Sequence, residues 1–365
     1  MDARLESVDF AALAGFSRDD CAPAYATFLA SARAIGEGLA ATRPARPAPP
    51  GLTRVAGLAR AAGPLPQAPA RRFFEDNFRA FTVAPADAQG GFVTGYYEPR
   101  VKGALAPSAR FSAPIFARPD DLVSLAPGEA PPGFDPALSG ARRGADGVLR
   151  PYPERAAIEA DPGRRAIVWL EDAVEVFLIQ VQGSASVELP DGRVLRLAYD
   201  GRNGQPYTSI GKILIARGAI AESAMSLASM KAWLRANGLA PGEPARAIMR
   251  RNRSYVFFKL EGGFDPATGP IGGAGLALAP LRSIAVDRSL WPYGTPFFIA
   301  ANLPWQGPES SAFARLMIAQ DTGSAILGPA RADIFFGGGD AAGERAGAIR
   351  HGADFAVLLA REDAP

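Results

Sequence analysis

The chain contains few of the side chains on which many enzyme mechanisms depend. Its 365 residues include one cysteine, Cys21, and one histidine, His351. An intrachain disulfide is therefore excluded, and a zinc site built from cysteine and histidine is not expected. A Ser-His-Asp triad would have to use His351, which lies close to the C-terminus. We expect Cys21 to be a small buried residue in a helix. Carboxylates are expected to carry any chemistry, with no metal and no cofactor.

The sequence also lacks a strong excess of charge and lacks long apolar runs. Its net charge is +2, and its basic residues are mostly scattered arginines, so no nucleic-acid partner is predicted. No run of apolar residues is long enough to predict a membrane-spanning helix. The opening MDARLESVDFAALAG has neither the basic end nor the apolar core of a secretory signal. Either the protein is cytoplasmic or its signal segment is not present in this chain.

Helical patterns are concentrated in the N-terminal part of the chain. Residues 19–40 form an amphipathic stripe that Asp19 or Asp20 can cap. Residues 69–81 place four phenylalanines at helical spacing, which is typical of core packing. A further helix is predicted over residues 221–237.

Strand patterns dominate the rest of the chain. Residues 90–100 predict a strand that Pro99 ends, and residues 101–165 predict short strands at best. Residues 174–201 predict two strands joined by a hairpin turn at "PDG". From residue 254 onward, short apolar runs follow one another closely, which favours a small β-barrel or a sandwich.

These patterns predict a barrel interrupted by a second domain. The N-terminal helices are too few to form a core alone, so residues 1–98 and 240–365 are assigned to one domain of helices and barrel strands. Residues 99–239 are then an inserted β-rich domain of ordinary domain size. A groove between the two domains is the default ligand site.

Three aspartates lie beside the C-terminal strands: Asp287, Asp321 and Asp333. A plain interpretation is that aspartate marks strand ends because its side chain bonds the turn backbone. Asp333 differs because its neighbours are apolar, and we place Arg331 in the preceding turn. Burial without a cation raises a carboxyl pKa, so Asp333 can stay protonated and donate its proton. Asp287 and Asp321 are predicted to remain ionised and structural.

Other stretches carry polar groups that suit a sugar. "IQVQGSAS" offers Gln180 or Gln182 together with Ser184, and "YDGRNGQPYTSIGK" contains Asp200 and Asn203. A plain surface loop also explains the second stretch. Tyr96 and Tyr97 alternate across a strand, so one ring should face outward and could stack on a pyranose, although core packing explains such rings equally well.

Together these blocks resemble the membrane-bound lytic murein transglycosylase A family with its C-terminal three-aspartate domain. The blocks run in the family's order over about residues 90–350, and they are "GYYEP", "VQGS", "YDGRNGQPYTSIGK", "NRSYVFF", "GPIG", "SIAVDRSLWPYGTP", "QDTGSAILGPARADIFFG" and "AGERAG". The sequence departs from the pattern at Ala185 and Ser324, where glycine is expected.

The resemblance implies a mainly β fold with N-terminal helices, namely a double-psi β-barrel with an inserted second β-domain. It implies cleavage of the MurNAc-β-1,4-GlcNAc bond of peptidoglycan with formation of 1,6-anhydro-MurNAc ends. Asp333 matches the family's single general acid and base. Tyr97, Gln182, Ser184, Asp200, Asn203 and Asp321 are the expected substrate-binding residues, and Asp287 is expected to support the site.

The resemblance also implies where and with what the protein works. Its partners would be peptidoglycan glycan strands, with cell-wall synthesis or division proteins as further candidates. Its location would be periplasmic, with outer-membrane association as an additional expectation. Two alternatives remain open at this point: a glycoside hydrolase of the same fold that pairs Asp333 with Asp321 or Asp287, and a non-enzymatic glycan-binding protein.

Overall fold

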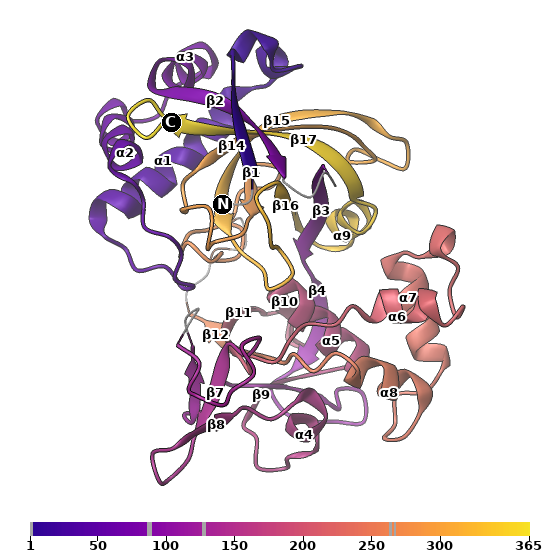
Figure 1. The fold of residues 1–365 in the computed structure, drawn as a ribbon. Coiled ribbons are helices and arrows are strands. Elements are labelled where there is room, and N and C mark those ends of the chain that lie inside the picture. Colours follow the sequence, from indigo (N-terminus) through magenta and orange to yellow (C-terminus); the bar gives the residue numbers. More distant parts are fainter. Residues whose placement is uncertain (1–2, 86–89, 126–128, 263–264, 266–267) are drawn as a thin grey trace. The chain divides into compact units, whose positions relative to one another are not determined.

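The computed structural model describes residues 3–85, 90–125, 129–262, 265 and 268–365. Its contacts divide the chain into a barrel unit, Met1–Tyr97 with Pro266–Pro365, and an insert unit, Glu98–Asp265 (Figure 1). Residues 240–265, which the sequence analysis assigned to the barrel domain, belong to the insert unit. The physical reason is strand pairing, because β12 (Val256–Glu261) pairs antiparallel with β11 (Val194–Arg202) of that unit.

In the barrel unit, six strands pair in a closed ring. The ring runs β17-β14-β15-β13-β16-β3 and closes through pairing of β3 with β17. Its strands are β3 (Gly91–Glu98), β13 (Ser283–Ala285), β14 (Pro296–Leu303), β15 (Ser311–Asp321), β16 (Arg331–Gly338) and β17 (Arg350–Ala360). Two further strands, β1 (Ala3–Val8) and β2 (Phe78–Pro85), extend the sheet from β17. The closely spaced apolar runs of the sequence therefore form a barrel and not a sandwich.

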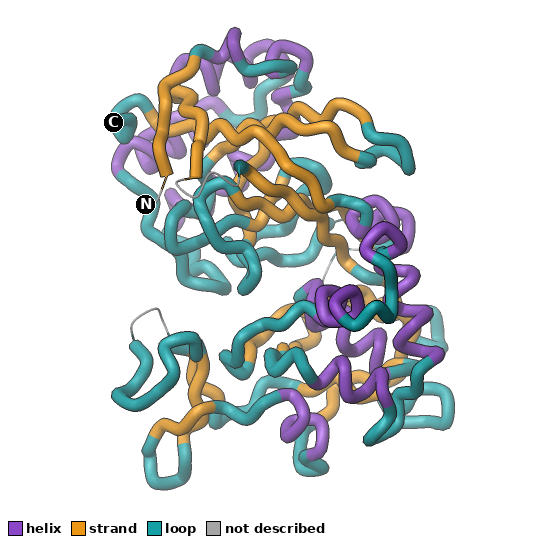
Figure 2. The backbone as a smooth tube through the Cα atoms, turned by 45° about the vertical axis from the view of Figure 1, so that its right-hand side comes forward, coloured by secondary structure: helices purple, strands orange, loops and turns teal. Residues whose placement is uncertain are grey.

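The N-terminal helices cover one side of this barrel (Figures 1 and 2). They are α1 (Cys21–Glu37), α2 (Pro50–Ala62) and α3 (Gln67–Asn77), preceded by the short 3-10 helices η1 (Phe10–Ala12) and η2 (Phe16–Arg18). Their buried side chains form one core with barrel residues such as Phe298 and Leu316. Cys21 is fully buried in that core, as predicted. The prediction that the helices pack on the C-terminal barrel is confirmed.

Helix α1 begins where its capping residue predicts. The Asp20 side chain accepts a hydrogen bond from Ala22 N, which satisfies one of the free N–H groups of the first turn. Asp19 has a different role, because its carboxylate forms a buried ion pair with Arg282 at 2.8 Å and also accepts from Leu316 N. These contacts fix the start of α1 to the barrel.

The predicted helix over residues 69–81 is partly wrong. Helix α3 ends at Asn77, and Phe78 and Phe81 lie in β2. The spacing of the phenylalanines stays compatible with a helix, but the backbone N–H and C=O groups of residues 78–82 pair with β17. Tertiary pairing therefore decides where this helix ends.

The insert unit contains a six-stranded sheet and a small three-stranded one. The larger sheet has the order β12-β11-β10-β4-β9-β5, and the smaller has the order β6-β7-β8. The remaining strands of the unit are β4 (Arg100–Ala104), β5 (Ala113–Phe116), β6 (Leu122–Ser124), β7 (Gly140–Arg143), β8 (Leu149–Pro151), β9 (Ala166–Leu170) and β10 (Ser184–Glu188). The short strands predicted for residues 101–165 and the hairpin at "PDG", which joins β10 to β11, are confirmed.

Helices of the insert unit gather beside its larger sheet (Figure 2). They are α4 (Arg155–Ala160), α5 (Ala173–Gln182), α6 (Ile210–Ala216), η3 (Glu222–Ala224), α7 (Leu227–Ala236) and α8 (Pro244–Arg250). The helix predicted over residues 221–237 corresponds to η3 and α7. Helices α5 to α8 share a core of their own.

The strand predicted at the start of residues 174–201 is wrong, because residues 173–182 form helix α5. Its Val176 and Ile179 pack against strands of the sheet, whereas Phe177 and Leu178 pack against the neighbouring helices. A helix buried on two faces has no polar stripe, so its sequence loses the helical period. The capping residues still mark it, because Asp172 accepts from the first turn and Gly183 ends the helix with φ 88°.

Candidate active site

Strands β3 and β16 are neighbours in the barrel. Every second residue of one strand lies beside every second residue of the other, on the same face. The ring of Phe92 lies under the Arg331 guanidinium, 5.5 Å from its centre, and Thr94 bonds Asp333. At the inner end of the row, the rings of Tyr96 and Phe335 are 5.3 Å apart. Side chains alternate across a strand, so residues at spacing two share a face. This row, Phe92, Thr94 and Tyr96 facing Arg331, Asp333 and Phe335, is called the β3–β16 ladder below.

Asp333 is the acid at the centre of the ladder. Its Oδ1 accepts a hydrogen bond of 2.5 Å from Thr94 Oγ1. The residue keeps some exposure, but the surrounding protein removes most of the water from its carboxyl. This desolvation raises the pKa of Asp333 to about 6; the Thr94 hydrogen bond and the Arg331 charge oppose the rise, and the Asp321 charge adds to it. Asp333 is therefore part protonated near neutral pH, as a proton donor must be.

Arg331 lies in the strand, which corrects its predicted place in the turn. It is the first residue of β16, so it shares a face with Asp333. Its Nη2 donates to Thr94 Oγ1 at 2.8 Å, and its Nη1 donates to the carbonyl of Ala332. The cation thus contacts the hydroxyl that bonds Asp333. Its charge lowers the pKa of the acid, but less than desolvation raises it.

Asp321 lies at the end of β15 and is held on both carboxylate oxygens. Its Oδ2 accepts from the Tyr96 hydroxyl at 2.8 Å, and its Oδ1 accepts from Gly273 N at 2.7 Å. The residue is 9% exposed. Both donors favour an immobile carboxylate, so the predicted structural role fits the geometry better than direct contact with a substrate.

Asp287 organises a turn and a neighbouring loop. Its Oδ1 accepts from the backbone N–H and the hydroxyl of Ser289, and its Oδ2 accepts from Gly328 N. The plain interpretation of a turn aspartate therefore describes Asp287 correctly. Its bond to Gly328 N holds the loop that leads into β16, the strand that carries Asp333.

Three other predicted residues lie at one end of a hairpin in the insert unit. Ser184 begins β10 opposite Ala198, and Asp200 lies two residues farther along β11. Gln182 is the last residue of α5, directly before this end. Gln182 and Asp200 are partly exposed, whereas Ser184 is 8% exposed. The hairpin therefore brings together three of the predicted polar side chains.

Two predicted substrate-binding residues, Asn203 and Tyr97, make structural contacts instead. The Asn203 amide donates to the carbonyls of Pro153 and Arg253, and its Oδ1 accepts from Gln205 N and Tyr255 N. It is fully buried, so no group remains for a sugar.

Tyr97 is 6% exposed, and its ring lies so close to α9 (Asp340–Gly347) that a Cβ added at Gly343 would be 2.7 Å from it. The ring face that stacking on a sugar requires is covered. Tyr96 is buried as well, so the expectation that one of the two rings faces outward is wrong.

Comparisons with known proteins agree with one another. Residues 92–259 match the MltA specific insert domain, and residues 282–359 match the 3D domain. The membrane-bound lytic murein transglycosylase A of Vibrio cholerae is 32% identical, over 75% of this chain and 67% of that protein. The chain belongs to the membrane-bound lytic murein transglycosylase A family. The corresponding Escherichia coli protein is 31% identical, over 74% of this chain and 67% of its own length.

Solved structures extend the family likeness to the fold. The crystal structure of a membrane-bound lytic murein transglycosylase from Agrobacterium tumefaciens is 34% identical and covers 98% of both chains with a TM-score of 0.84. A structure of MltA from Neisseria gonorrhoeae is 29% identical and covers 100% of this chain and 94% of that one, with a TM-score of 0.78. The family assignment thus applies to nearly the whole length of the chain.

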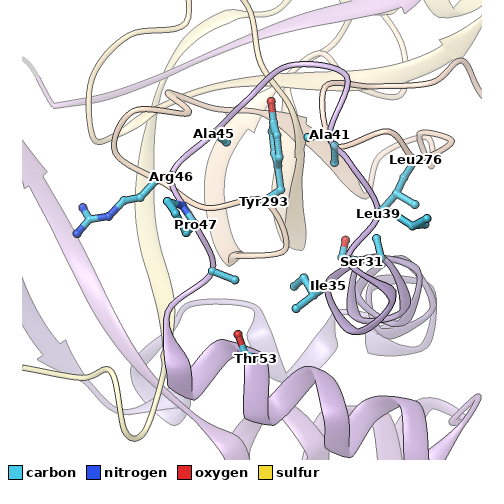
Figure 3. Close-up of a pocket in the computed structure, with 14 residues that line it drawn as sticks. Ser31, Ile35, Leu39, Ala41, Ala45, Arg46, Pro47, Thr53, Leu276 and Tyr293 are labelled. Atoms are coloured by element: carbon cyan, nitrogen blue, oxygen red, sulfur yellow. The ribbon is translucent and has the colours of Figure 1, made fainter. Parts of the chain in front are cut away.

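The matched 3D domain contains all three aspartates, and the barrel unit also has a pocket that none of the three lines. This pocket of about 380 Å³ is formed by α1, the segment after it and the ring of Tyr293 (Figure 3). Asp333 does not line it. Figure 3 shows the Tyr293 ring between Ala41 and Ala45 and the Arg46 side chain pointing away from the other lining residues. Burial and the charge of Asp321 raise the pKa of the Tyr293 hydroxyl.

Sequence reasoning missed Thr94 and Phe92 beside Asp333, and it considered Arg331 but placed it in the turn. Phe92, Thr94 and Arg331 are ordinary strand residues, and only their even spacing from Tyr96 or Asp333 marks them. The pairing of β3 with β16, more than 200 residues apart, has no local signal.

Within the described ranges, no helix is both long and apolar enough to cross a lipid bilayer.

Proposed function

We propose that this protein cleaves the β-1,4 bond between N-acetylmuramic acid and N-acetylglucosamine in peptidoglycan and leaves a 1,6-anhydro-muramyl end. The observation that carries the proposal is the environment of Asp333, whose pKa desolvation raises to about 6. A carboxyl with such a pKa donates a proton readily and can take one back. Family relatives carry the name lytic murein transglycosylase, and a solved structure of Escherichia coli MltA contains bound chitohexaose.

One carboxyl is sufficient for this reaction. Protonated Asp333 gives its proton to the glycosidic oxygen as the bond to C1 breaks. The resulting carboxylate then takes the proton of the muramyl C6 hydroxyl while O6 bonds to C1. The acid is restored, and no water is consumed. The nucleophile belongs to the substrate, so its high effective concentration replaces a second catalytic group.

A hydrolase of the same fold fits the site less well. It would ordinarily need a second carboxylate to activate water or to attack the sugar. Both oxygens of Asp321 accept hydrogen bonds from protein groups, and so do both oxygens of Asp287. Neither carboxylate is therefore free to act as a base beside Asp333.

Finer features of the family belong to the same proposal. The closed six-stranded ring would have double-psi connectivity, and the insert unit would contribute Gln182, Ser184 and Asp200 to glycan binding. Glycan strands of peptidoglycan would be the substrate, with cell-wall synthesis or division proteins as partners. The relatives are named membrane-bound, which supports a periplasmic location with outer-membrane association.

The deciding experiment is digestion of purified sacculi with mass analysis of the released fragments. Wild-type protein should release muropeptides lighter by one water than hydrolysed ones. Asp333→Asn should lose turnover by about 10²-fold or more, the effect of removing a general acid, and should still bind sacculi. Asp354→Asn, an exposed aspartate of β17, is the matched control and should keep full activity.

Stability measurements show whether the inactive variant is folded. The pKa of Asp333 is higher in the folded protein than in the unfolded chain. Ionising Asp333 therefore lowers the free energy of unfolding as pH rises from about 4 through about 6. Asp333→Asn should therefore be more stable than wild type at pH 8, by up to about 3 kcal/mol, and this difference should vanish below pH 4. Hydrolysed products, or an Asp333→Asn variant with unchanged turnover, would contradict the proposal.

A further inference from the structure

Arg331 occupies a fixed position beside the acid without bonding it. Its guanidinium is held at three points: the carbonyl of Ala332, the hydroxyl of Thr94 and the face of Phe92. A guanidinium can only donate hydrogen bonds, so Thr94 Oγ1 must be the acceptor in the 2.8 Å bond. The hydroxyl hydrogen of Thr94 then remains available for another partner.

The other partner of that hydroxyl is Asp333. The distance from Thr94 Oγ1 to Asp333 Oδ1 is 2.5 Å, which is typical of a hydroxyl bonded to a carboxylate. A hydroxyl that accepts from a cation is a better donor, because hydrogen bonds in a chain polarise one another. The order of donation is therefore Arg331 to Thr94 to Asp333 Oδ1.

We propose that Arg331 is a positioning residue for the proposed transglycosylase reaction: through Thr94 it keeps Asp333 Oδ1 as a hydrogen-bond acceptor and leaves Oδ2 as the oxygen that carries the transferable proton. The proposal rests on the proposed function for the meaning of that proton, but the chain of donors is independent of it. During the reaction, Oδ2 gives its proton to the glycosidic oxygen and later takes the proton of the C6 hydroxyl. Arg331 and Thr94 stabilise the carboxylate that exists between these two steps.

The electrostatics of the site agree with this arrangement. Among the described residues, the charged or titratable groups that interact with Asp333 are Arg331 on its own strand, Asp321 at the end of β15 and Tyr96 on β3. β13 contributes only Ala285 opposite Asp333. Asp321 favours the protonated acid, whereas Arg331 favours the carboxylate. Arg331 therefore limits how weak an acid Asp333 becomes, and a weaker acid would protonate the leaving oxygen more slowly.

The test uses two measurements on the full chain. The first is the pH dependence of kcat/KM for digestion of sacculi, whose alkaline limb reports loss of the proton from Asp333. The second is a ¹³C NMR titration of the Asp333 carboxyl without substrate, assigned by comparison with Asp333→Asn. Substitutions are Arg331→Gln, Arg331→Lys, Thr94→Val, Thr94→Ser and the double variant Thr94→Val/Arg331→Gln.

Arg331→Gln and Thr94→Val should each move the alkaline limb and the titration midpoint of Asp333 to higher pH, by about one unit, and should lower kcat. Thr94→Ser keeps the hydroxyl and should keep the alkaline limb and the titration midpoint of Asp333 near the wild-type pH. Arg331→Lys should be intermediate because its point charge lacks the planar fork. In the Thr94→Val background, Arg331→Gln should add a clearly smaller shift. Arg345→Gln, which removes a cation over Phe336 of the same strand, is the matched control and should shift neither measurement.

Two results would overturn the inference. One is an Arg331→Gln protein whose limb and titration midpoint stay at the wild-type values. The other is an Arg331→Gln shift of equal size with and without the Thr94 hydroxyl, which would mean that the charge acts directly and not through Thr94. If wild-type protein releases no anhydro products, the proposed function fails, but the substrate-free titration still decides the role of Arg331.

Discussion

At the scale of single residues, the site separates three aspartates by what surrounds them. Asp287 and Asp321 each receive donors on both oxygens, whereas Asp333 receives one hydroxyl and is otherwise desolvated. Desolvation destabilises a charged carboxylate, and it raises the pKa of Asp333. Among the three, Asp333 is therefore the one suited to donate a proton.

Asp321 should influence the reaction through its charge. It raises the pKa of Asp333, so Asp321→Asn should lower that pKa and move the alkaline limb of kcat/KM to lower pH. This direction is opposite to that expected for Arg331→Gln. The measurement is the pH profile of sacculus digestion, with Asp354→Asn as control. An unchanged or upward-shifted limb in Asp321→Asn would show that its charge does not reach Asp333.

At the scale of elements, the β3–β16 ladder depends on how closely α9 packs on β3. A Cβ added at Gly95 would lie 2.8 Å from the backbone of Ala346, a distance that real Cβ atoms do not show. Gly95 lies between Thr94 and Tyr96, which bond Asp333 and Asp321. The glycine therefore lets the helix approach while the two neighbouring side chains face the aspartates.

Gly95→Ala should force α9 and β3 apart and displace Thr94 and Tyr96. We expect a loss of 1–3 kcal/mol in the free energy of unfolding, the usual effect of overpacking, together with reduced turnover. Gly57→Ala, in helix α2, is the matched control, because a Cβ added there would meet no neighbouring atom within 4 Å. That control should stabilise the protein by about 0.5–1 kcal/mol and leave turnover unchanged. Urea unfolding and the sacculus assay measure both effects, and a Gly95→Ala protein as stable and active as wild type would contradict this account.

At the scale of the whole molecule, each unit has its own core. The barrel closes within residues 1–97 and 266–365, and its helices pack on it there. The sheet and helices of the insert unit bury separate clusters of side chains. Units with separate cores can in principle fold separately.

Replacing residues 98–265 with a flexible glycine-serine linker should therefore leave a barrel unit that folds cooperatively. Because we propose that the insert unit contributes glycan contacts, this shortened protein should lose turnover on sacculi while Asp333 keeps its raised titration midpoint. Circular dichroism, urea unfolding and the ¹³C titration test the two parts of the prediction. An unfolded product would show that the barrel depends on the insert unit.

Much of the fold could be predicted because local signals agreed with tertiary packing. The barrel runs, the capped helix α1 and the hairpin at "PDG" all have patterns that match their burial. The failures occurred where burial removed the pattern or where tertiary strand pairing overrode it. Helix α5 is buried on two faces and looks like a strand, and Phe78 and Phe81 continue a helical spacing into β2.

The candidate site shows the same division. The desolvated carboxyl of Asp333 could be predicted, because a carboxylate among apolar residues is a local feature of the sequence. Asn203 and Tyr97 looked like sugar contacts. In the structure, Asn203 bonds four backbone groups and neighbouring residues cover the ring of Tyr97. Nothing local in the sequence indicates which polar side chains will find all their hydrogen-bond partners within the protein.

By itself, the sequence determined the barrel strands, the N-terminal helices, the family and the apolar neighbours of Asp333, because each depends on residue order over short stretches. Only the tertiary structure decided that Thr94 and Arg331 bond in series to Asp333, since β3 and β16 are far apart in the chain and meet only when the ring closes. It also decided which aspartates are held by donors on both oxygens. The chemistry of a carboxyl is set by what surrounds it in space, and the chain order does not contain that neighbourhood.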